Sequence, residues 1–214
     1  MPKQQDTGGQ ESEDRAMMTR CIAVAVRSAE AGEYPYGVVI SRSGTVVAES
    51  INRVAHERDV TRHAEVVAIS EAQKTLQMVS LEDCTIYVSA EPCVYCSYAI
   101  RESRIGRVVY GLASPHMGGV SKWNVLADET LPAAMPEVFD EPPAIIAGYM
   151  ANEVEQELLR VSPVVFGMII ERGLFTAAPH RSVHARGAPN VEERLMRRLM
   201  TFLRRTVFDR FGRS

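Results

Sequence analysis

Apolar residues recur along this chain with two different periods, and each change of period marks the end of one predicted element. Apolar positions three or four residues apart predict a first helix that begins near Ser12, as its N-cap, and ends near Gly32. Shorter segments rich in β-branched residues predict strands. We expect strands at 36–41, 46–51, 85–89, 107–111 and 143–148, and further helices at 62–75, from Pro92 onward, at 150–159 and at 161–175.

The order of these elements predicts an α/β fold. The first two strands form a hairpin across Arg42-Ser43-Gly44-Thr45, and strands then alternate with helices. Such alternation favours a three-layer α/β/α sandwich. The intervening segments 52–61 and 112–141 are expected to be loops. We expect three parts: a disordered start at 1–10, a main domain at 11–160 and a C-terminal helical extension at 161–214.

The extension differs from the rest of the chain in its charge. The net charge is −3, yet residues 181–214 hold nine arginines and three acidic residues, so they carry +6 and the remainder carries −9. An acidic body argues against a wide nucleic-acid footprint on it. A linker at 176–189 leads to a predicted basic amphipathic helix at 190–211. Its apolar stripe favours packing or dimerisation over binding to nucleic acid or a membrane surface.

The composition also indicates a location. No apolar run approaches the length of a membrane span, and the polar start is unlike a signal peptide. The four cysteines form no disulfide framework, which suits a reducing compartment. We therefore expect a cytoplasmic protein with no membrane partner.

Two short motifs carry the candidate chemistry: His-Ala-Glu at residues 63–65 and Pro-Cys-Val-Tyr-Cys at residues 92–96. His63, Cys93 and Cys96 offer three ligands of a tetrahedral zinc site whose fourth position is left for water, as in catalytic sites. Bound zinc lowers the pKa of such a water from about 15.7 to near 7. Glu65 stands two residues from the histidine and is the candidate proton carrier.

Other interpretations of these residues remain open. A Cys-x-x-Cys pair alone could be a redox pair or half of a structural zinc knuckle. Cys21 and Cys84, however, stand singly and supply no fourth ligand at a short spacing. The full pattern, a histidine two residues before a glutamate and then Pro-Cys-x-x-Cys, is the signature of zinc-dependent base deaminases.

Further segments of the chain support this interpretation. They are Tyr34-Pro35-Tyr36-Gly37-Val38-Val39-Ile40, Asn52-Arg53, the strand that leads from Asp83 into Cys93, and Ser103-Arg104-Ile105-Gly106-Arg107-Val108-Val109-Tyr110-Gly111. With the zinc motif, they make the stretch from Tyr34 to about Leu159 resemble the cytidine deaminase-like superfamily. Within it, the chain is most similar to bacterial tRNA adenosine deaminases and, less closely, to guanine deaminases.

The resemblance implies a five-stranded mixed sheet, Zn²⁺ bound by His63, Cys93 and Cys96, a proton shuttle at Glu65, and a homodimer or higher homo-oligomer. It also implies that the Asn52 amide contacts the substrate, although the residues alone allow a turn role at a strand end. Further candidates for substrate contact are Tyr36, the backbone amide of Ala64 and the carbonyl of Ala90 or Glu91.

The chain departs from the tRNA enzymes beside the metal motif. Ser97-Tyr98 replaces a small Ala-Gly pair, and Tyr98 is expected to narrow the space by the metal helix if it faces the pocket. The loop from Ser114 to Asn124 replaces a Lys-Thr-Gly stretch. His116 and Trp123 in this loop are of types that close over a flat heterocycle, although a loop tryptophan more often packs into a core or an interface. Gly118-Gly119 is expected to form a turn or a lid hinge.

We therefore expect a zinc-dependent hydrolase of cyclic C–N bonds, which converts an aminated nucleobase-like heterocycle, as a purine base or nucleoside, to its keto product and ammonia. The alternative is a deaminase of the wobble adenosine in tRNA, favoured by residues 103–111 and the basic tail. A third hypothesis is a zinc-stabilised scaffold without catalysis, against which the intact Glu65 argues.

Overall fold

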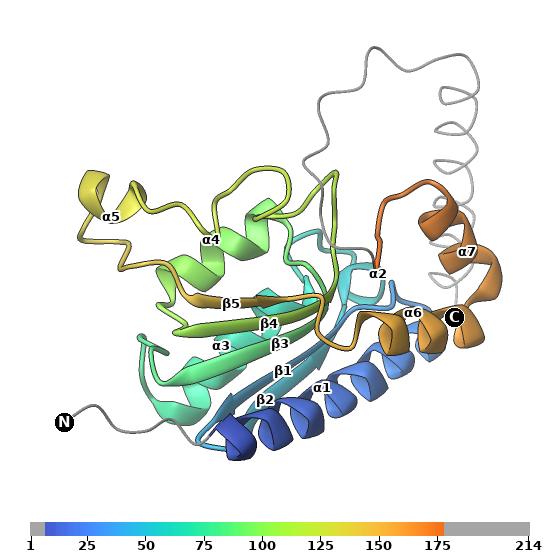
Figure 1. Cartoon of the computed structure of the whole chain (residues 1–214), viewed down its shortest axis with the longest axis horizontal. Coiled ribbons are helices and arrows are strands. Elements are labelled where there is room, and N and C mark those ends of the chain that lie inside the picture. The colour runs from blue at the N-terminus through green and yellow to red at the C-terminus, as the bar shows by residue number, and fades with distance from the viewer. Residues whose placement is uncertain (1–6, 178–214) are drawn as a thin grey trace, which may run out of the picture.

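A five-stranded mixed sheet forms the centre of the molecule (Figure 1). The computed structural model describes residues 7–177. The strand order is β2-β1-β3-β4-β5, antiparallel from β2 to β3 and parallel from β3 to β5. The strands are β1 (Gly37–Arg42), β2 (Thr45–Ile51), β3 (Cys84–Ala90), β4 (Arg107–Leu112) and β5 (Ala144–Ala147).

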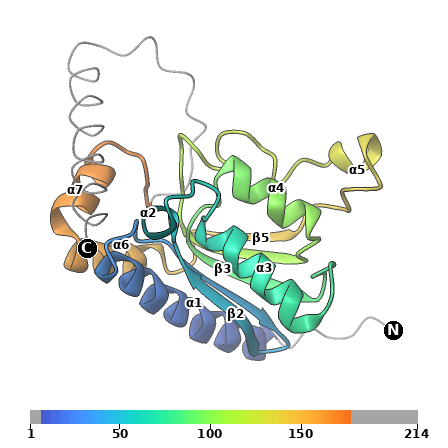
Figure 2. The same cartoon turned by 180° about the vertical axis from the view of Figure 1, so that it is seen from behind.

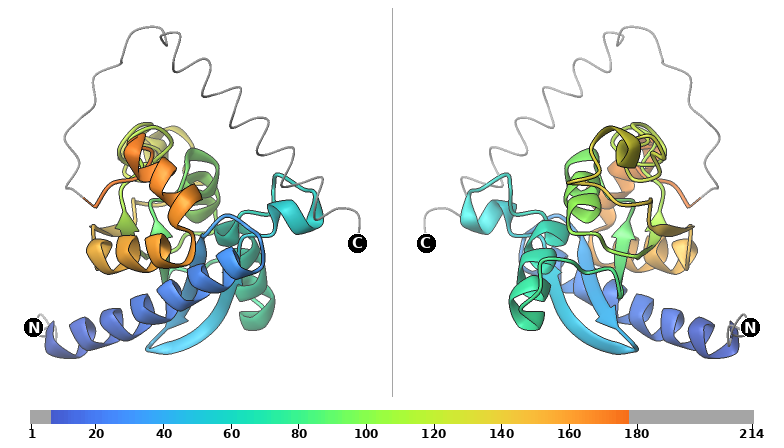
Figure 3. Two further views of the ribbon diagram at one scale, coloured as in Figure 1. Left: turned by 90° about the vertical axis from the view of Figure 1, so that its right-hand side faces the viewer. Right: turned by 90° about the vertical axis from the view of Figure 1, so that its left-hand side faces the viewer.

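Helices cover both faces of the sheet, which confirms the predicted three-layer α/β/α sandwich. One face carries α1 (Thr7–Glu30) and α6 (Ala151–Val161), and α7 (Pro163–Glu171) packs on α6 (Figures 1 and 3). The opposite face carries α3 (Ala64–Leu76) and α4 (Val94–Glu102), which lie side by side in Figure 2.

Each face of the sheet has its own hydrophobic core, because successive side chains of a strand point to opposite faces. On β1, Val39 packs with Met18 of α1 and Val154 of α6. Its neighbour Val38 packs with Ala68 of α3 on the other face. The second core therefore supports the two helices that carry the metal motif.

The first helix begins at Thr7, so the helix start predicted near Ser12 is wrong and residues 7–10 are helical. Gln10 donates a hydrogen bond of 3.1 Å to Asp14 one turn later, and Asp14 is itself buried. The polar sequence gave no sign of this anchor, because it depends on contacts of Asp14 with distant strands.

Two segments predicted as loops each contain one short helix. Residues 52–61 include α2 (Val54–Glu57), and residues 112–141 include α5 (Leu131–Ala134). The carboxylate of Glu33 accepts hydrogen bonds from the backbone N–H of Ala55 and His56 and so caps α2. That cap comes from about twenty residues away, so the local pattern could not reveal it.

The segment after α7 returns to the sheet. The backbone N–H and C=O groups of Ala113 and Thr176 pair with each other, and Phe175 joins the core between α1, α6 and the sheet. The remainder of the predicted linker, 178–189, and the predicted helix 190–211 lie outside the described residues. Among the helices of residues 7–177, none has the length and apolar character needed to cross a membrane.

Candidate active site and metal centre

The two metal motifs lie at the N-terminal ends of neighbouring helices. His63 is the N-cap of α3 and Cys93 is the N-cap of α4, with Cys96 in the first turn of α4. His63 was expected inside the first turn and instead precedes it by one residue, and Pro92 likewise precedes the N-cap of α4. The partial positive charge of both helix ends favours thiolates at this point.

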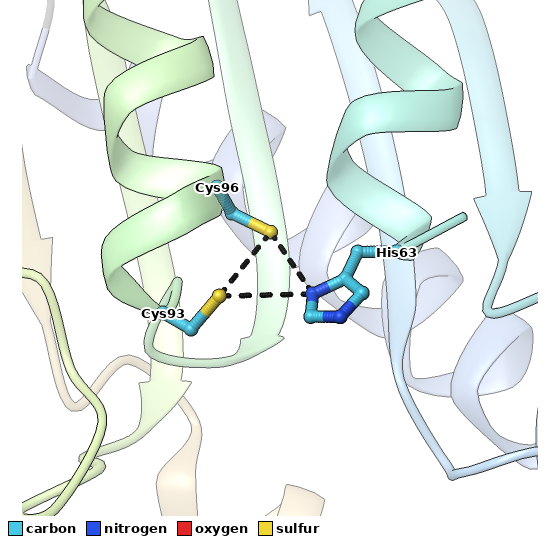
Figure 4. A group of neighbouring side chains, drawn as sticks. All are labelled: His63, Cys93 and Cys96. Carbon is cyan, nitrogen blue, oxygen red and sulfur yellow. Dashed lines mark hydrogen bonds between the residues drawn. The ribbon is translucent and has the colours of Figure 1, made fainter. Parts of the chain in front are cut away.

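The three side chains converge on one point (Figure 4). Nδ1 of His63 lies 3.6 Å from Sγ of Cys93 and 3.4 Å from Sγ of Cys96, and the two sulfur atoms are 3.6 Å apart. Tetrahedral zinc with ordinary bond lengths requires S···S of about 3.8 Å and S···N of about 3.6 Å. The spacing and chemistry of these donors therefore fit zinc.

The electrostatics of the three ligands follow from their mutual contacts. A hydrogen bond from Cys96 and another from His63 lower the pKa of Cys93 to about 4, against the opposing effect of burial. Burial raises the pKa of Cys96 well above its ordinary value, and the hydrogen bond with Cys93 adds to this. The hydrogen bond with Cys93 raises the pKa of His63. These contacts thus favour the thiolate form at Cys93.

Glu65 is buried beside these ligands. Burial, followed by the negative charge of Cys93, raises its pKa to about 7, although the charge of His63 and a hydrogen bond with Cys96 act in the opposite direction. A carboxyl group with a pKa near the working pH can both accept and donate protons efficiently. The position of Glu65 therefore suits a proton carrier.

Tyr36 and Asn52 contact each other through their backbones. Burial raises the pKa of Tyr36, and the charges of Tyr34, Glu65 and the two thiols add to the rise. The Asn52 N–H donates to the Tyr36 carbonyl at 3.3 Å. Asn52 is buried, and its side-chain amide donates to Glu33 at 2.9 Å.

Ala64, Tyr98 and His116 have different surroundings. Ala64 is the first residue of α3 and is buried; N–H groups at such a position have no partner within their own helix. The Tyr98 ring packs edge-on against Phe139 at 5.3 Å and is 43% exposed. His116 is exposed. The predicted narrowing of the pocket by Tyr98 therefore receives no support from its main contact.

Trp123 and the two glycines lie in the loop that follows β4. Trp123 is 56% exposed, so it does not pack into the core. Gly118 and Gly119 are both buried, and neither has a positive φ. A Cβ atom at Gly118 would collide with the Glu91 carboxylate, and one at Gly119 would collide with Ser97. Gly119 lies in a turn, as predicted, and close packing explains both glycines better than a lid hinge does.

Sequence reasoning missed the contacts that two side chains make beside the ligands, and for Glu91 it considered only the backbone carbonyl. Tyr95 places its ring edge-on against the His63 imidazole, with 5.6 Å between the ring centroids. Glu91 is buried directly after β3, and its carboxylate accepts hydrogen bonds from backbone N–H groups of the loop that follows β4. The available signal for Glu91 was its place in the sequence, since an acidic side chain between an apolar strand and the Pro-Cys motif is expected to be buried and to need hydrogen-bond donors.

A His/Cys/Cys triad that can hold zinc, a buried glutamate beside it and this sandwich fold together define the zinc-dependent hydrolytic deaminases. The sequence model described as the cytidine and deoxycytidylate deaminase zinc-binding region matches residues 11–112, which include both motifs. The chain belongs to this cytidine and deoxycytidylate deaminase family.

Two of the similar curated proteins are tRNA-specific adenosine deaminases, and a third is a longer protein of another name. The chain is 43% identical over 108 residues to the tRNA-specific adenosine deaminase of Aquifex aeolicus, which covers 50% of this chain and 72% of that protein. It is 33% identical over 144 residues to the enzyme of the same name from Bacillus subtilis, covering 66% and 84%. It is also 36% identical over 192 residues to the tRNA(Ile)-lysidine synthase of Deinococcus radiodurans, covering 83% of this chain and 30% of that protein.

Solved structures show the same fold. A structure from a study of tRNA:A34 deaminases matches with a TM-score of 0.59 and 30% identity, covering 67% of this chain and 99% of that one. The guanine deaminase of Nitrosomonas europaea matches with a TM-score of 0.55 and 22% identity, covering 68% and 82%, and shares the fold alone.

Proposed function

We propose that this protein deaminates an adenosine within tRNA to inosine, with zinc held by His63, Cys93 and Cys96. The observation that carries the proposal is the tetrahedral spacing of these ligands next to buried Glu65, in a chain 43% identical to a tRNA-specific adenosine deaminase. The proposal takes up the alternative drawn from the sequence, the wobble adenosine of tRNA, in place of a free base or nucleoside.

The chemistry asks little of the remaining residues beyond proton transfer and positioning. Zinc, when bound, supplies an activated water at neutral pH. Glu65 accepts a proton from that water, passes it to the ring nitrogen next to the amine, and then donates a proton to the departing amine. Adenosine and water thus become inosine and ammonia. A pKa of about 7 suits Glu65 for both directions of transfer.

Asn52 is the residue that we propose to align the base. Its side-chain amide is held by the Glu33 carboxylate, and its backbone is held by the Tyr36 carbonyl. The Arg53 N–H also donates to the Arg62 carbonyl at 3.0 Å, which places Asn52 close to the chain segment that precedes His63. An amide fixed in this way can hydrogen-bond a base edge without first losing rotational freedom.

The test is a comparison of substrates at equal concentration. A tRNA anticodon stem-loop with a wobble adenosine should yield inosine, whereas free adenosine, adenine, guanine and cytidine should release little ammonia. Activity on the RNA should fall steeply as salt rises, because phosphate contacts release counterions. Ammonia release from a free base, with no inosine in the RNA, would contradict the proposal and favour a small-molecule deaminase.

We also propose a cytoplasmic location and a homodimer. The free thiols of buried Cys21 and Cys84 are compatible with a reducing compartment. Light scattering on the purified full chain tests the dimer, since a monomeric mass would contradict it.

A further inference from the structure

The loop that follows β4 forms a rim beside the metal centre, and buried Glu91 holds it in place. We name residues 114–124 the rim loop. The Glu91 carboxylate accepts hydrogen bonds from the N–H groups of Ser114, Val120 and Ser121 at 2.7, 2.9 and 2.7 Å, and also from the Ser121 hydroxyl. One carboxylate therefore ties together both ends of a turn of the rim loop.

The rim loop is also joined to the start of the metal helix. The Gly119 N–H donates to the Pro92 carbonyl at 2.9 Å, and the Val94 N–H donates to the Met117 carbonyl at 3.2 Å. A β-bridge links Gly118 to the metal ligand Cys93. These contacts lie on both sides of Cys93, so the backbone of the rim loop has a fixed position relative to the metal centre.

Trp123 is carried by this fixed backbone and presents its ring to solvent. Its N–H donates to the Gly118 carbonyl at 3.1 Å, and its side chain is 56% exposed. Nζ of Lys122 lies 5.8 Å from the centroid of the indole ring. An exposed aromatic ring with a cation over one face can stack on a nucleic-acid base and neutralise its phosphate.

We propose that Trp123 stacks on a nucleotide that flanks the target adenosine, with Lys122 close to its phosphate, and that Glu91 is the positioning residue that sets the ring there. This inference rests on the proposed function, because only an RNA substrate has a flanking nucleotide. The target base must leave its stack to reach the zinc site, which deprives its neighbour of a stacking partner. The indole ring of Trp123 replaces that partner.

Trp123 is the only tryptophan of the chain, so its fluorescence reports on the proposed contact directly. The Glu65→Gln protein, which should bind RNA without turnover, is titrated with the anticodon stem-loop. Saturable quenching is expected with this RNA, and much weaker quenching with RNA that is abasic beside the target adenosine. Equal quenching by intact and abasic RNA would overturn the stacking.

Kinetics provide an independent readout. Trp123→Ala should raise KM for the stem-loop about 5- to 150-fold, the range that corresponds to the loss of one stacked base, while Trp123→Phe should retain most of the affinity. Val79→Ala is the matched control, because Val79 is 80% exposed and lies beyond the far end of α3 from His63. An unchanged KM in Trp123→Ala would overturn the proposal.

Glu91→Gln tests the positioning role. The glutamine nitrogen cannot accept a hydrogen bond, so the variant loses part of the hold on the rim loop while keeping nearly the same volume. We expect a higher KM, weaker quenching, unchanged zinc content and a kcat close to that of wild type. A kcat loss with an unchanged KM would contradict this role. A wild-type protein that forms no inosine in RNA would instead contradict the proposed function.

Discussion

Nδ1 of His63 lies 3.4 Å from Sγ of Cys96, although the two residues are 33 positions apart and belong to different helices. The contact exists because α3 and α4 lie side by side on one face of the sheet and both begin at the same edge. The separation is close to the value of about 3.6 Å that tetrahedral zinc imposes on nitrogen and sulfur ligands. The sheet thus holds the two helices so that their N-terminal ends form the metal centre.

Cys93→Ala should abolish zinc binding and lower the thermal stability of the protein. The variant removes one of three ligands, and wild type gains about 2.7 kcal/mol of stability when free zinc is 100 times its dissociation constant. Metal analysis and thermal unfolding, with and without a chelator, measure both effects. Cys84→Ala is the control, because Cys84 is buried outside the triad. Full zinc content in Cys93→Ala would show that the triad is not the metal site.

Glu65→Gln should reduce turnover of the RNA about 10²- to 10⁴-fold, because the amide cannot transfer the proton. Its zinc content should stay at the wild-type level, since Glu65 lies outside the triad. Glu71→Gln, on the same helix and in an exposed ion pair with Arg53, should retain activity. Inosine formation and metal analysis on the same preparations are the measurements. Turnover by Glu65→Gln at the wild-type rate would assign the proton transfer to another group.

The metal centre was predictable because its ligands belong to two short sequence motifs. His63, Cys93 and Cys96 are recognisable by residue type and spacing, and the hydrophobic periods around them predict the helices that carry them. The five strands were predictable for the same reason, and their observed bounds differ from the expected ones by at most one residue.

The surroundings of the metal centre were less predictable because their contacts join distant parts of the chain. Glu91 binds backbone N–H groups 23 to 30 residues away, and backbone groups leave no mark on the residue types there. Tyr98 packs on Phe139, which lies in a loop that shows no regular hydrophobic period, so the sequence pattern could not place the two rings together. The cap that Glu33 provides for α2 has the same origin.

Asp14→Asn should lower the free energy of unfolding by about 3 kcal/mol at pH 7, since it removes the buried carboxylate that pairs with partly buried Arg107. Burial raises the pKa of Asp14, whereas hydrogen bonds from Arg107, Tyr87 and Gln10 lower it. The hydrogen bonds have the larger combined effect, so the pKa of Asp14 lies below its ordinary value of 3.8. The carboxylate therefore stabilises the fold above about pH 4, and this contribution is lost as the pH falls through the folded-state pKa.

Urea unfolding of wild type and Asp14→Asn between pH 7 and pH 3 measures this effect. The difference between the two proteins should be largest at pH 7 and should shrink below about pH 4. Glu49→Gln is a useful control, because the pairs of Glu49 with Arg20 and Arg27 are exposed and should contribute less than about 1 kcal/mol. A difference that grows as the pH falls would contradict the assignment.

Gly119→Ala should destabilise the protein by about 1–3 kcal/mol, because its new methyl group would collide with Ser97 on the metal helix. Removing the obstacle should restore part of the loss. Ser97→Gly alone should cost about 1–2 kcal/mol, through helix propensity and the lost hydrogen bond from the Ser97 hydroxyl to the Pro92 carbonyl, but the double variant should be more stable than the sum of the two single effects. The coupling is measured by urea unfolding of the four proteins in the cycle.

Gly167→Ala serves as the opposite control, since Gly167 lies in α7 with open space around its missing Cβ, and alanine there should stabilise the helix by about 0.5–1 kcal/mol. Equal effects of alanine at positions 119 and 167 would show that the rim loop does not pack against α4 as closely as the structure places it.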